Sequence, residues 1–173
     1  PVRLGNFSYF IAFEPQGGWG LWRTDGTPAG TTLCCSIDLS ATRAHAQSEY
    51  VSDLLLSGGA MYYFTSTGLW RTDGTPQGTS LVWAGTMRTA QGGAQQQPGR
   101  HAVATPTGVA FIAWDPTQSD YTLWTSDGTT AGTQRVADIR PSGGSDMNNL
   151  TAAGTSLFVT GFDGINARGL FVF

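Results

Sequence analysis

The chain has 173 residues, of which 40% are hydrophobic and only 12% are charged, and its formal net charge is −3. This length and apolar content suffice to bury a core, which excludes a disordered tail. All nine basic residues are scattered arginines, so the composition argues against a nucleic-acid partner, and no apolar run approaches the roughly 18 residues of a membrane span.

The first predicted strand is short, at residues 2–4, and a tight-turn signal at Gly5-Asn6 separates it from an apolar run at residues 10–13. A strand with Leu21-Trp22 follows, then an Asp-Gly turn and a last strand at residues 33–37. Turn signals bound each of these apolar runs, which favours strands over helices. The order predicts a four-stranded antiparallel meander.

The same order of strands returns further along the chain. The long second strand of the unit is expected at residues 61–64, 111–114 and 157–160 in the later copies. We expect units at residues 1–39, 50–86, 99–140 and 147–173, the last one incomplete, within a single domain of residues 1–173.

A repeated phrase, Leu-Trp-x-Thr/Ser-Asp-Gly-Thr-x-x-Gly-Thr, fixes the period of the repeat. It occupies residues 21–31, 69–79 and 123–133, and a partial copy begins at Leu170. The tryptophans lie 48 and 54 residues apart, a period typical of β-propeller blades. The sequence therefore predicts an all-β fold, a β-propeller or propeller segment of about four four-stranded antiparallel blades. Because the chain begins at Pro1 without methionine and the fourth copy is cut off, we expect a piece of a larger propeller or array.

The residue types of the phrase suit a blade. An aspartate and the glycine after it tolerate left-handed geometry at a turn, the second glycine is expected to adopt positive φ, and Leu and Trp on opposite strand faces can both pack between sheets. We expect structural roles for Trp22, Asp25, Gly26, Gly30, Trp70, Asp73, Gly74, Gly78, Trp124, Asp127, Gly128 and Gly132.

The phrase resembles the Glu-Leu-Trp-x-Ser/Thr-Asp-Gly-Thr-x-x-Gly-Thr repeat of large secreted or surface-exposed bacterial proteins, often labelled hyalin-like or propeller-repeat proteins. The resemblance covers nearly the whole chain, but Gly20, Gly68, Thr122 and Gly169 replace the glutamate. It implies an extracellular or cell-surface location, repeat arrays, and binding or adhesion roles. The partners that it implies are further repeats of the same polypeptide or of a like subunit.

The stretches that differ between units are the better guide to a ligand, because scaffold residues repeat while binding residues need not. Polar excursions lie at residues 40–50 and 87–101. We predict a binding or adhesion module that recognises a glycan or a surface protein, and the alternative for these stretches is a solvated insertion. The candidate ligand-binding residues are Trp19, as an exposed stacking platform, and Arg88, Gln95, Gln97, Arg100 and His101, as hydrogen-bonding groups.

Two other functions stay open. The first is a catalytic propeller of glycosidase or lyase type, which would assemble paired carboxylates across blades, and the second is a purely structural repeat element. We favour a protein that is not an enzyme. The candidate carboxylates are Glu14, Glu49, Asp115, Asp120 and Asp163.

No cofactor is expected, because His45 and His101 lie in different linkers without the ligand spacing of a zinc site. Calcium bound by Asp25, Asp73 and Asp127 with nearby carbonyl or threonine oxygens is the weaker alternative. Cys34 and Cys35 are adjacent and point to opposite faces of a strand, which predicts free thiols, with a strained redox-active pair as the alternative.

Overall fold

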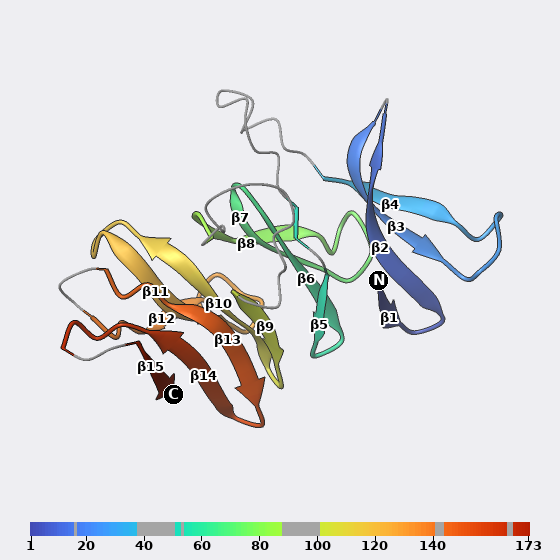
Figure 1. Cartoon of the computed structure of the whole chain (residues 1–173). Coiled ribbons are helices and arrows are strands. Elements are labelled where there is room, and N and C mark those ends of the chain that lie inside the picture. The colour runs from blue at the N-terminus through green and yellow to red at the C-terminus, as the bar shows by residue number, and fades with distance from the viewer. Residues whose placement is uncertain (16, 38–50, 53, 88–100, 141–143, 166–167) are drawn as a thin grey trace. The chain divides into compact units, whose positions relative to one another are not determined.

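The computed structural model describes residues 1–15, 17–37, 51–52, 54–87, 101–140, 144–165 and 168–173 (Figure 1). Over these ranges the chain forms strands and turns without a helix. None of the described residues therefore belongs to a helix long and apolar enough to cross a membrane.

The described strands form four antiparallel sheets, each a meander in chain order, which we call blades 1 to 4. Three blades have four strands and blade 4 has three, which confirms the predicted all-β fold of antiparallel propeller-type blades. Blade 1 consists of β1 (Val2–Leu4), β2 (Phe7–Glu14), β3 (Gly18–Thr24) and β4 (Thr32–Ser36). Blade 2 consists of β5 (Leu55–Ser57), β6 (Ala60–Thr65), β7 (Gly68–Thr72) and β8 (Ser80–Ala84). Blade 3 consists of β9 (Ala102–Thr105), β10 (Gly108–Asp115), β11 (Asp120–Ser126) and β12 (Gln134–Ala137), and blade 4 of β13 (Asn148–Ala153), β14 (Ser156–Gly161) and β15 (Gly169–Val172).

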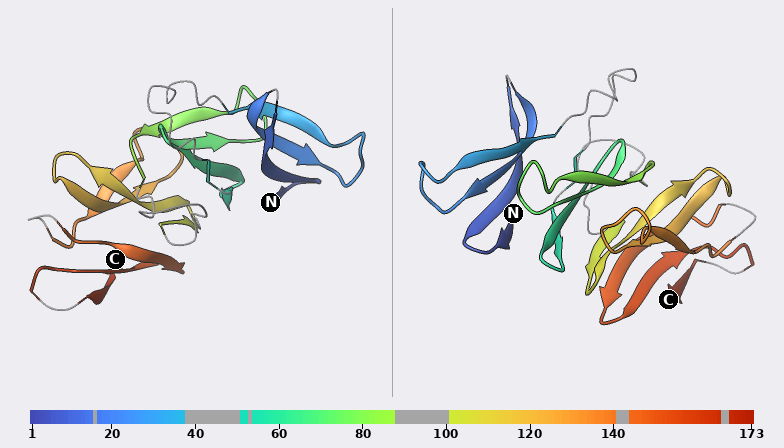
Figure 2. Two further views of the ribbon diagram at one scale, coloured as in Figure 1. Left: turned by 45° about the horizontal axis from the view of Figure 1, so that its top comes forward. Right: turned by 180° about the vertical axis from the view of Figure 1, so that it is seen from behind.

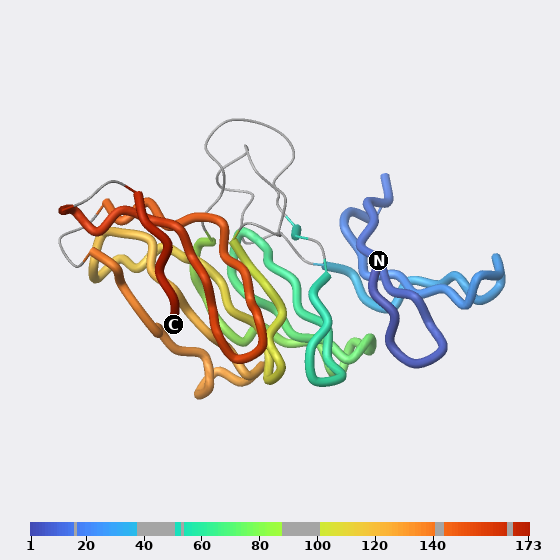
Figure 3. The backbone as a smooth tube through the Cα atoms, turned by 60° about the horizontal axis from the view of Figure 1, so that its bottom comes forward, coloured from blue at the N-terminus to red at the C-terminus, as the bar shows by residue number. Residues whose placement is uncertain are grey.

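The blades are grouped in two compact units. Unit 1, Pro1–Ala84, contains blades 1 and 2, and unit 2, Gly85–Phe173, contains blades 3 and 4. Figure 2 shows the twisted strands of each blade in two further views. Within unit 2, β13 runs beside β9, as the tube in Figure 3 also shows.

The Leu-Trp pair explains how the two blades of a unit pack. Leu21, Leu69 and Leu123 are fully buried, whereas the tryptophans that follow them are half-buried on the opposite strand face. In unit 1, Leu21 of blade 1 belongs to the same core cluster as Tyr63 of blade 2, and Trp70 packs against that cluster. The leucine face of the first blade thus packs on the tryptophan face of the second.

Unit 2 follows the same rule. Leu123 of blade 3 shares a core cluster with Leu157 and Val159 of blade 4, and Phe171 of blade 4 packs against it. Phe171 occupies the tryptophan position of the fourth repeat.

The last strand of each four-stranded blade pairs with its Leu-Trp strand through a register shift. The shift falls between Leu21 and Trp22, and it recurs between the same two residues of the repeat in blades 2 and 3. A β-bulge at this point increases the local twist of the strand.

Candidate functional site

The Asp-Gly turn is a self-contained network of hydrogen bonds. In blade 1, the backbone nitrogen and the hydroxyl of Thr27 donate to Oδ1 of Asp25, at 2.9 and 2.8 Å. The hydroxyl oxygen of Thr27 also accepts a bond from the Gly30 nitrogen at 2.9 Å. The same bonds surround Asp73 and Asp127 in blades 2 and 3. This repetition is what a structural turn requires.

The turn lowers the pKa of its aspartate. The bonds from the Thr27 backbone and hydroxyl lower the pKa of Asp25. The hydroxyl and backbone bonds from the corresponding threonines lower the pKa of Asp73 and of Asp127. These weak calcium candidates lie in separate turns, and no group of three or more His, Cys, Asp or Glu side chains that could hold a metal ion occurs among the described residues.

The prediction of positive φ at the second glycine of the phrase is wrong. Positive φ falls on the first glycine, at 97° in Gly26, 92° in Gly74 and 89° in Gly128. The second glycine is needed for space, because a Cβ at Gly30 would lie 2.0 to 2.3 Å from the Asp25 carboxylate. The same close approach occurs at Gly78 and Gly132.

An aromatic pair lies at the end of the long hairpin in blades 1 and 3. Phe13 and Trp19 are cross-strand partners of β2 and β3, and their ring centroids are 5.6 Å apart in an edge-to-face arrangement. Trp114 and Tyr121 are the corresponding partners of β10 and β11, with centroids 5.3 Å apart in the same arrangement. Cross-strand partners share a sheet face, so each pair presents one joint surface.

Each aromatic pair joins an anchored ring to an exposed one. Trp19 and Tyr121 are half-buried and pack against the cores of their units. Phe13 is 56% exposed and Trp114 is 38% exposed. In blade 2 the corresponding hairpin ends sooner, at the pair Thr65 and Gly68, and carries no such aromatic pair. The aromatic surface is thus an addition to the repeated scaffold.

Polar side chains accompany these rings in sequence. The exposed Glu14 follows Phe13, and Gln118 lies in the hairpin loop after Trp114. Phe13 and Glu14 are consecutive residues of β2, so their side chains point to opposite faces of the sheet. The exposed aromatic ring itself can stack on an apolar ring face of a ligand. Trp19, predicted as an exposed platform, is the anchored member of its pair, and sequence reasoning missed Phe13, Trp114 and Tyr121.

The candidate carboxylates Asp115 and Asp120 face each other across β10 and β11, but each is buried with its own partners. Thr117 donates to Oδ1 of Asp115 from its backbone nitrogen and hydroxyl at 2.9 and 2.6 Å, and Arg135 lies 3.3 Å from Oδ2. Burial raises the pKa of Asp115, but the Thr117 bonds and the Arg135 charge outweigh it and lower the pKa.

Asp120 accepts a bond from the Ser145 nitrogen at 2.8 Å. The partners of these two acids favour a role in fixing the hairpin over a shared acid–base role. Of the other candidates, Glu14 is exposed, Asp163 accepts a bond from the Ile165 nitrogen at 2.8 Å, and Glu49 lies outside the described residues.

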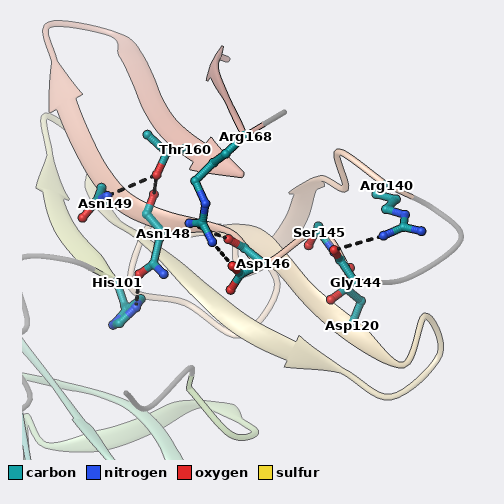
Figure 4. Close-up of polar contacts among 10 residues, drawn as sticks. All are labelled: His101, Asp120, Arg140, Gly144, Ser145, Asp146, Asn148, Asn149, Thr160 and Arg168. Carbon is teal, nitrogen blue, oxygen red and sulfur yellow. Dashed lines mark hydrogen bonds and ion pairs between the residues drawn. The ribbon is translucent and has the colours of Figure 1, made fainter. Parts of the chain in front are cut away.

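His101 belongs to a group of polar contacts between blades 3 and 4 (Figure 4). The ring is buried, and Nε2 is 2.8 Å from Oδ1 of Asn148. Nearby, Arg168 forms an ion pair with Asp146. This geometry favours a structural role for His101. The other candidates of the linkers, Arg88, Gln95, Gln97, Arg100 and His45, lie outside the described residues.

Cys34 and Cys35 are free and half-buried on β4. Burial raises the pKa of both thiols. Since the thiolate is the reactive form, this shift disfavours nucleophilic chemistry at both cysteines.

Four antiparallel meander blades define a β-propeller-type chain, and solved structures share this fold. The chain is similar to a puromycin hydrolase mutant complexed with PGG, at 14% identity and a TM-score of 0.58, over 98% of this chain and 25% of that one. It is also similar to TolB from Acinetobacter baumannii, at 12% identity and a TM-score of 0.55, over 100% of this chain and 40% of TolB. The chain thus spans a quarter and two fifths of these proteins, and at such identities the likeness shows the fold alone. No family model and no curated protein matches it.

Proposed function

We propose that this chain is a carbohydrate-binding module of an extracellular or cell-surface protein, and that the aromatic pairs of blades 1 and 3 are its sugar-stacking platforms. The observation that carries the proposal is the recurrence of one exposed aromatic pair at equivalent positions in two blades. The extracellular location, and assembly with further repeats of the same kind, rest on the resemblance of the repeated phrase.

A sugar suits these platforms better than a protein surface does. A stable protein interface buries about 800 Å² on each partner, whereas each platform here exposes mainly one ring, Phe13 or Trp114. A pyranose has a flat apolar face of similar size, which can stack on such a ring.

The test is binding to a panel of neutral polysaccharides in affinity gel electrophoresis, with Phe13→Ala and Trp114→Ala as the variants. Replacing an aromatic side chain on which a base stacks costs about 1–3 kcal/mol, and we expect a similar effect for a sugar. Each variant should therefore bind roughly tenfold more weakly at the altered platform.

Leu33→Ala and Val136→Ala are matched controls, since these apolar side chains are also exposed but belong to no aromatic pair. They should bind as the wild type does. The proposal fails if no polysaccharide slows the wild-type protein, or if Phe13→Ala and Trp114→Ala bind as well as the controls. Binding of a surface protein with no polysaccharide binding would favour the other ligand class.

A further inference from the structure

Two adjacent thiols of blade 1 lie where its last strand bulges. An unbroken strand would turn the side chains of Cys34 and Cys35 to opposite faces, as the sequence predicts. In the structure, Cys35 pairs with Leu21 of β3. Leu33 pairs with the next residue of β3, Trp22, which leaves Cys34 as the extra residue of the bulged strand.

The packing of the two cysteines shows the effect of this bulge. Cross-strand partners share a sheet face, so Cys35 lies on the face of the buried Leu21. Cys34 packs against the same core cluster as Cys35, the cluster that Leu21 forms with Met61 and Tyr63 of blade 2. The prediction of opposite faces for the two cysteines is therefore wrong. The bulge brings both thiols to one face.

The two thiols lie at the contact between blades 1 and 2 within unit 1. Sγ of Cys35 is 3.6 Å from Oγ1 of Thr79, which closes the Asp-Gly turn of blade 2. Cys34 and Cys35 form no disulfide, and both are half-buried. Because part of each residue stays exposed, a ligand of few atoms has access to them.

The same bulge carries other residue types in the next two blades. The equivalent pair is Val82 and Trp83 in blade 2 and Val136 and Ala137 in blade 3. The pair of thiols is thus an addition of blade 1 to the repeated scaffold.

We propose that Cys34 and Cys35 form a chelating dithiol that binds trivalent arsenic compounds. Sulfur is a soft donor, and arsenic(III) is a soft, polarizable acceptor. An arsenical with one organic group needs two sulfur ligands, whereas a structural zinc ion usually needs four. This site goes beyond the carbohydrate function and does not depend on it.

The binding step needs no oxidant. When an arsenic(III) oxide reacts with the two thiols, two As–S bonds replace two S–H bonds, and the oxygen leaves arsenic with both protons as water. Burial raises the pKa of both thiols, and the reaction starts from their protonated form. A direct disulfide is disfavoured, because adjacent Cα atoms lie about 3.8 Å apart and disulfides usually need at least about 4.4 Å. An arsenic atom between the two sulfurs makes a longer bridge.

The probe is phenylarsine oxide, added to the reduced full chain and followed by intact-protein mass spectrometry. The wild type should gain one phenylarsine oxide less one water. Cys34→Ser and Cys35→Ser each keep one thiol and should bind roughly a hundredfold or more weakly, because the second bond of a chelate forms within one molecule. An excess of a monothiol should leave the wild-type adduct intact, and 1,2-ethanedithiol should release it.

Two further proteins separate a shared face from mere adjacency. Leu33→Cys combined with Cys35→Ser keeps two consecutive thiols but puts them on opposite faces, so it should bind as weakly as the single-thiol variants. Val136→Cys combined with Ala137→Cys, in a chain that also carries Cys34→Ser and Cys35→Ser, moves the pair to the equivalent bulge of blade 3. This protein should again take up one equivalent.

The proposal is overturned if the wild type takes up no phenylarsine oxide, or if either single-thiol variant holds it as tightly as the wild type does. Equally tight binding by the protein with Leu33→Cys and Cys35→Ser would also overturn it, because a shared face would then be unnecessary. Circular dichroism shows whether each variant is folded. If the protein with Leu33→Cys does not fold, the pair moved to blade 3 decides, and its failure to bind overturns the proposal.

Discussion

Gly26 and Gly74 adopt almost the same backbone conformation, with φ of 97° and 92°, in very different surroundings. Nothing lies within 4 Å of a Cβ built on Gly26, whereas a Cβ on Gly74 meets the Tyr9 ring at 2.6 Å. Substitutions at these two glycines therefore distinguish the free-energy cost of a left-handed backbone from the cost of a steric clash.

We expect Gly26→Ala to lower the free energy of unfolding by about 1 kcal/mol, the usual cost of an L-residue in this conformation. Gly74→Ala should cost about 2 kcal/mol more, because the buried Tyr9 must move. Urea unfolding followed by tryptophan fluorescence measures both values. Equal losses in the two variants would show that Tyr9 does not restrict this corner.

The indole nitrogens show a further difference between equivalent residues. Trp124 donates to the hydroxyl of Thr122 at 2.8 Å, and Trp70 donates to the hydroxyl of Thr65 at 3.1 Å. In blade 1 the indole nitrogen of Trp22 is buried without a hydrogen-bond partner among the described residues. Thr122 stands where the bacterial repeat that the phrase resembles has glutamate. The residue at this position can therefore accept a hydrogen bond from the tryptophan of its own blade.

At the scale of the element, the Asp-Gly turn makes the stability of the folded protein depend on pH. The turn lowers the pKa of Asp25, Asp73 and Asp127, so these carboxylates bind protons less readily in the folded than in the unfolded chain. Their stabilisation is present above the unfolded pKa of about 3.9 and is lost as the pH falls through the lower folded pKa.

The triple variant Asp25→Asn, Asp73→Asn and Asp127→Asn should melt at a lower temperature than the wild type at pH 7, because an amide oxygen is a weaker acceptor than a carboxylate. The difference should shrink as the pH falls below about 4. Thermal unfolding by circular dichroism between pH 7 and 2.5 follows it. A difference that stays constant over this range would contradict a role for the ionised form.

Much of the element scale could be predicted from the sequence, because the repeat marks turns and strands at the same places in each copy. The bulge between Leu21 and Trp22 could not, since it depends on how β4 pairs with β3. The reason for the second glycine of the phrase could not be predicted either. A Cβ at Gly30 would clash with the Asp25 carboxylate, whose position follows from the folded turn. Register and side-chain position are properties of the folded blade.

The candidate site could likewise be predicted from the sequence only in part. Trp19 is predicted from the sequence as an exposed stacking platform, but its partner Phe13 is recognised only when the strands are paired. A difference between repeats can locate a candidate site in the sequence, and the pairing of the strands shows which side chains form it.

At the scale of the whole molecule, each unit carries one aromatic pair, so the chain should take up two short oligosaccharides at these platforms. The ligand for isothermal titration calorimetry is an oligosaccharide cut from a polysaccharide that the protein binds. The titration should give two equivalents of bound oligosaccharide per chain at the platforms.

Phe13→Ala and Trp114→Ala should each remove one equivalent, and the double variant should remove both. A single equivalent in the parent protein, or a loss of both in one single variant, would contradict two separate platforms. A polymer long enough to occupy both sites would gain avidity from their linkage.

The Asp-Gly turn also bears on how the chain folds. Its hydrogen bonds join residues no more than seven positions apart, from Thr24 to Thr31 and within Asp25 to Gly30. Contacts of such short separation close small loops and form quickly. The turn can therefore set the register between each Leu-Trp strand and the strand that follows it early in folding, before blades that are far apart in the sequence meet. In a chain of near-identical repeats, this favours pairing of each Leu-Trp strand with the strand that follows it over pairing with a copy elsewhere in the chain.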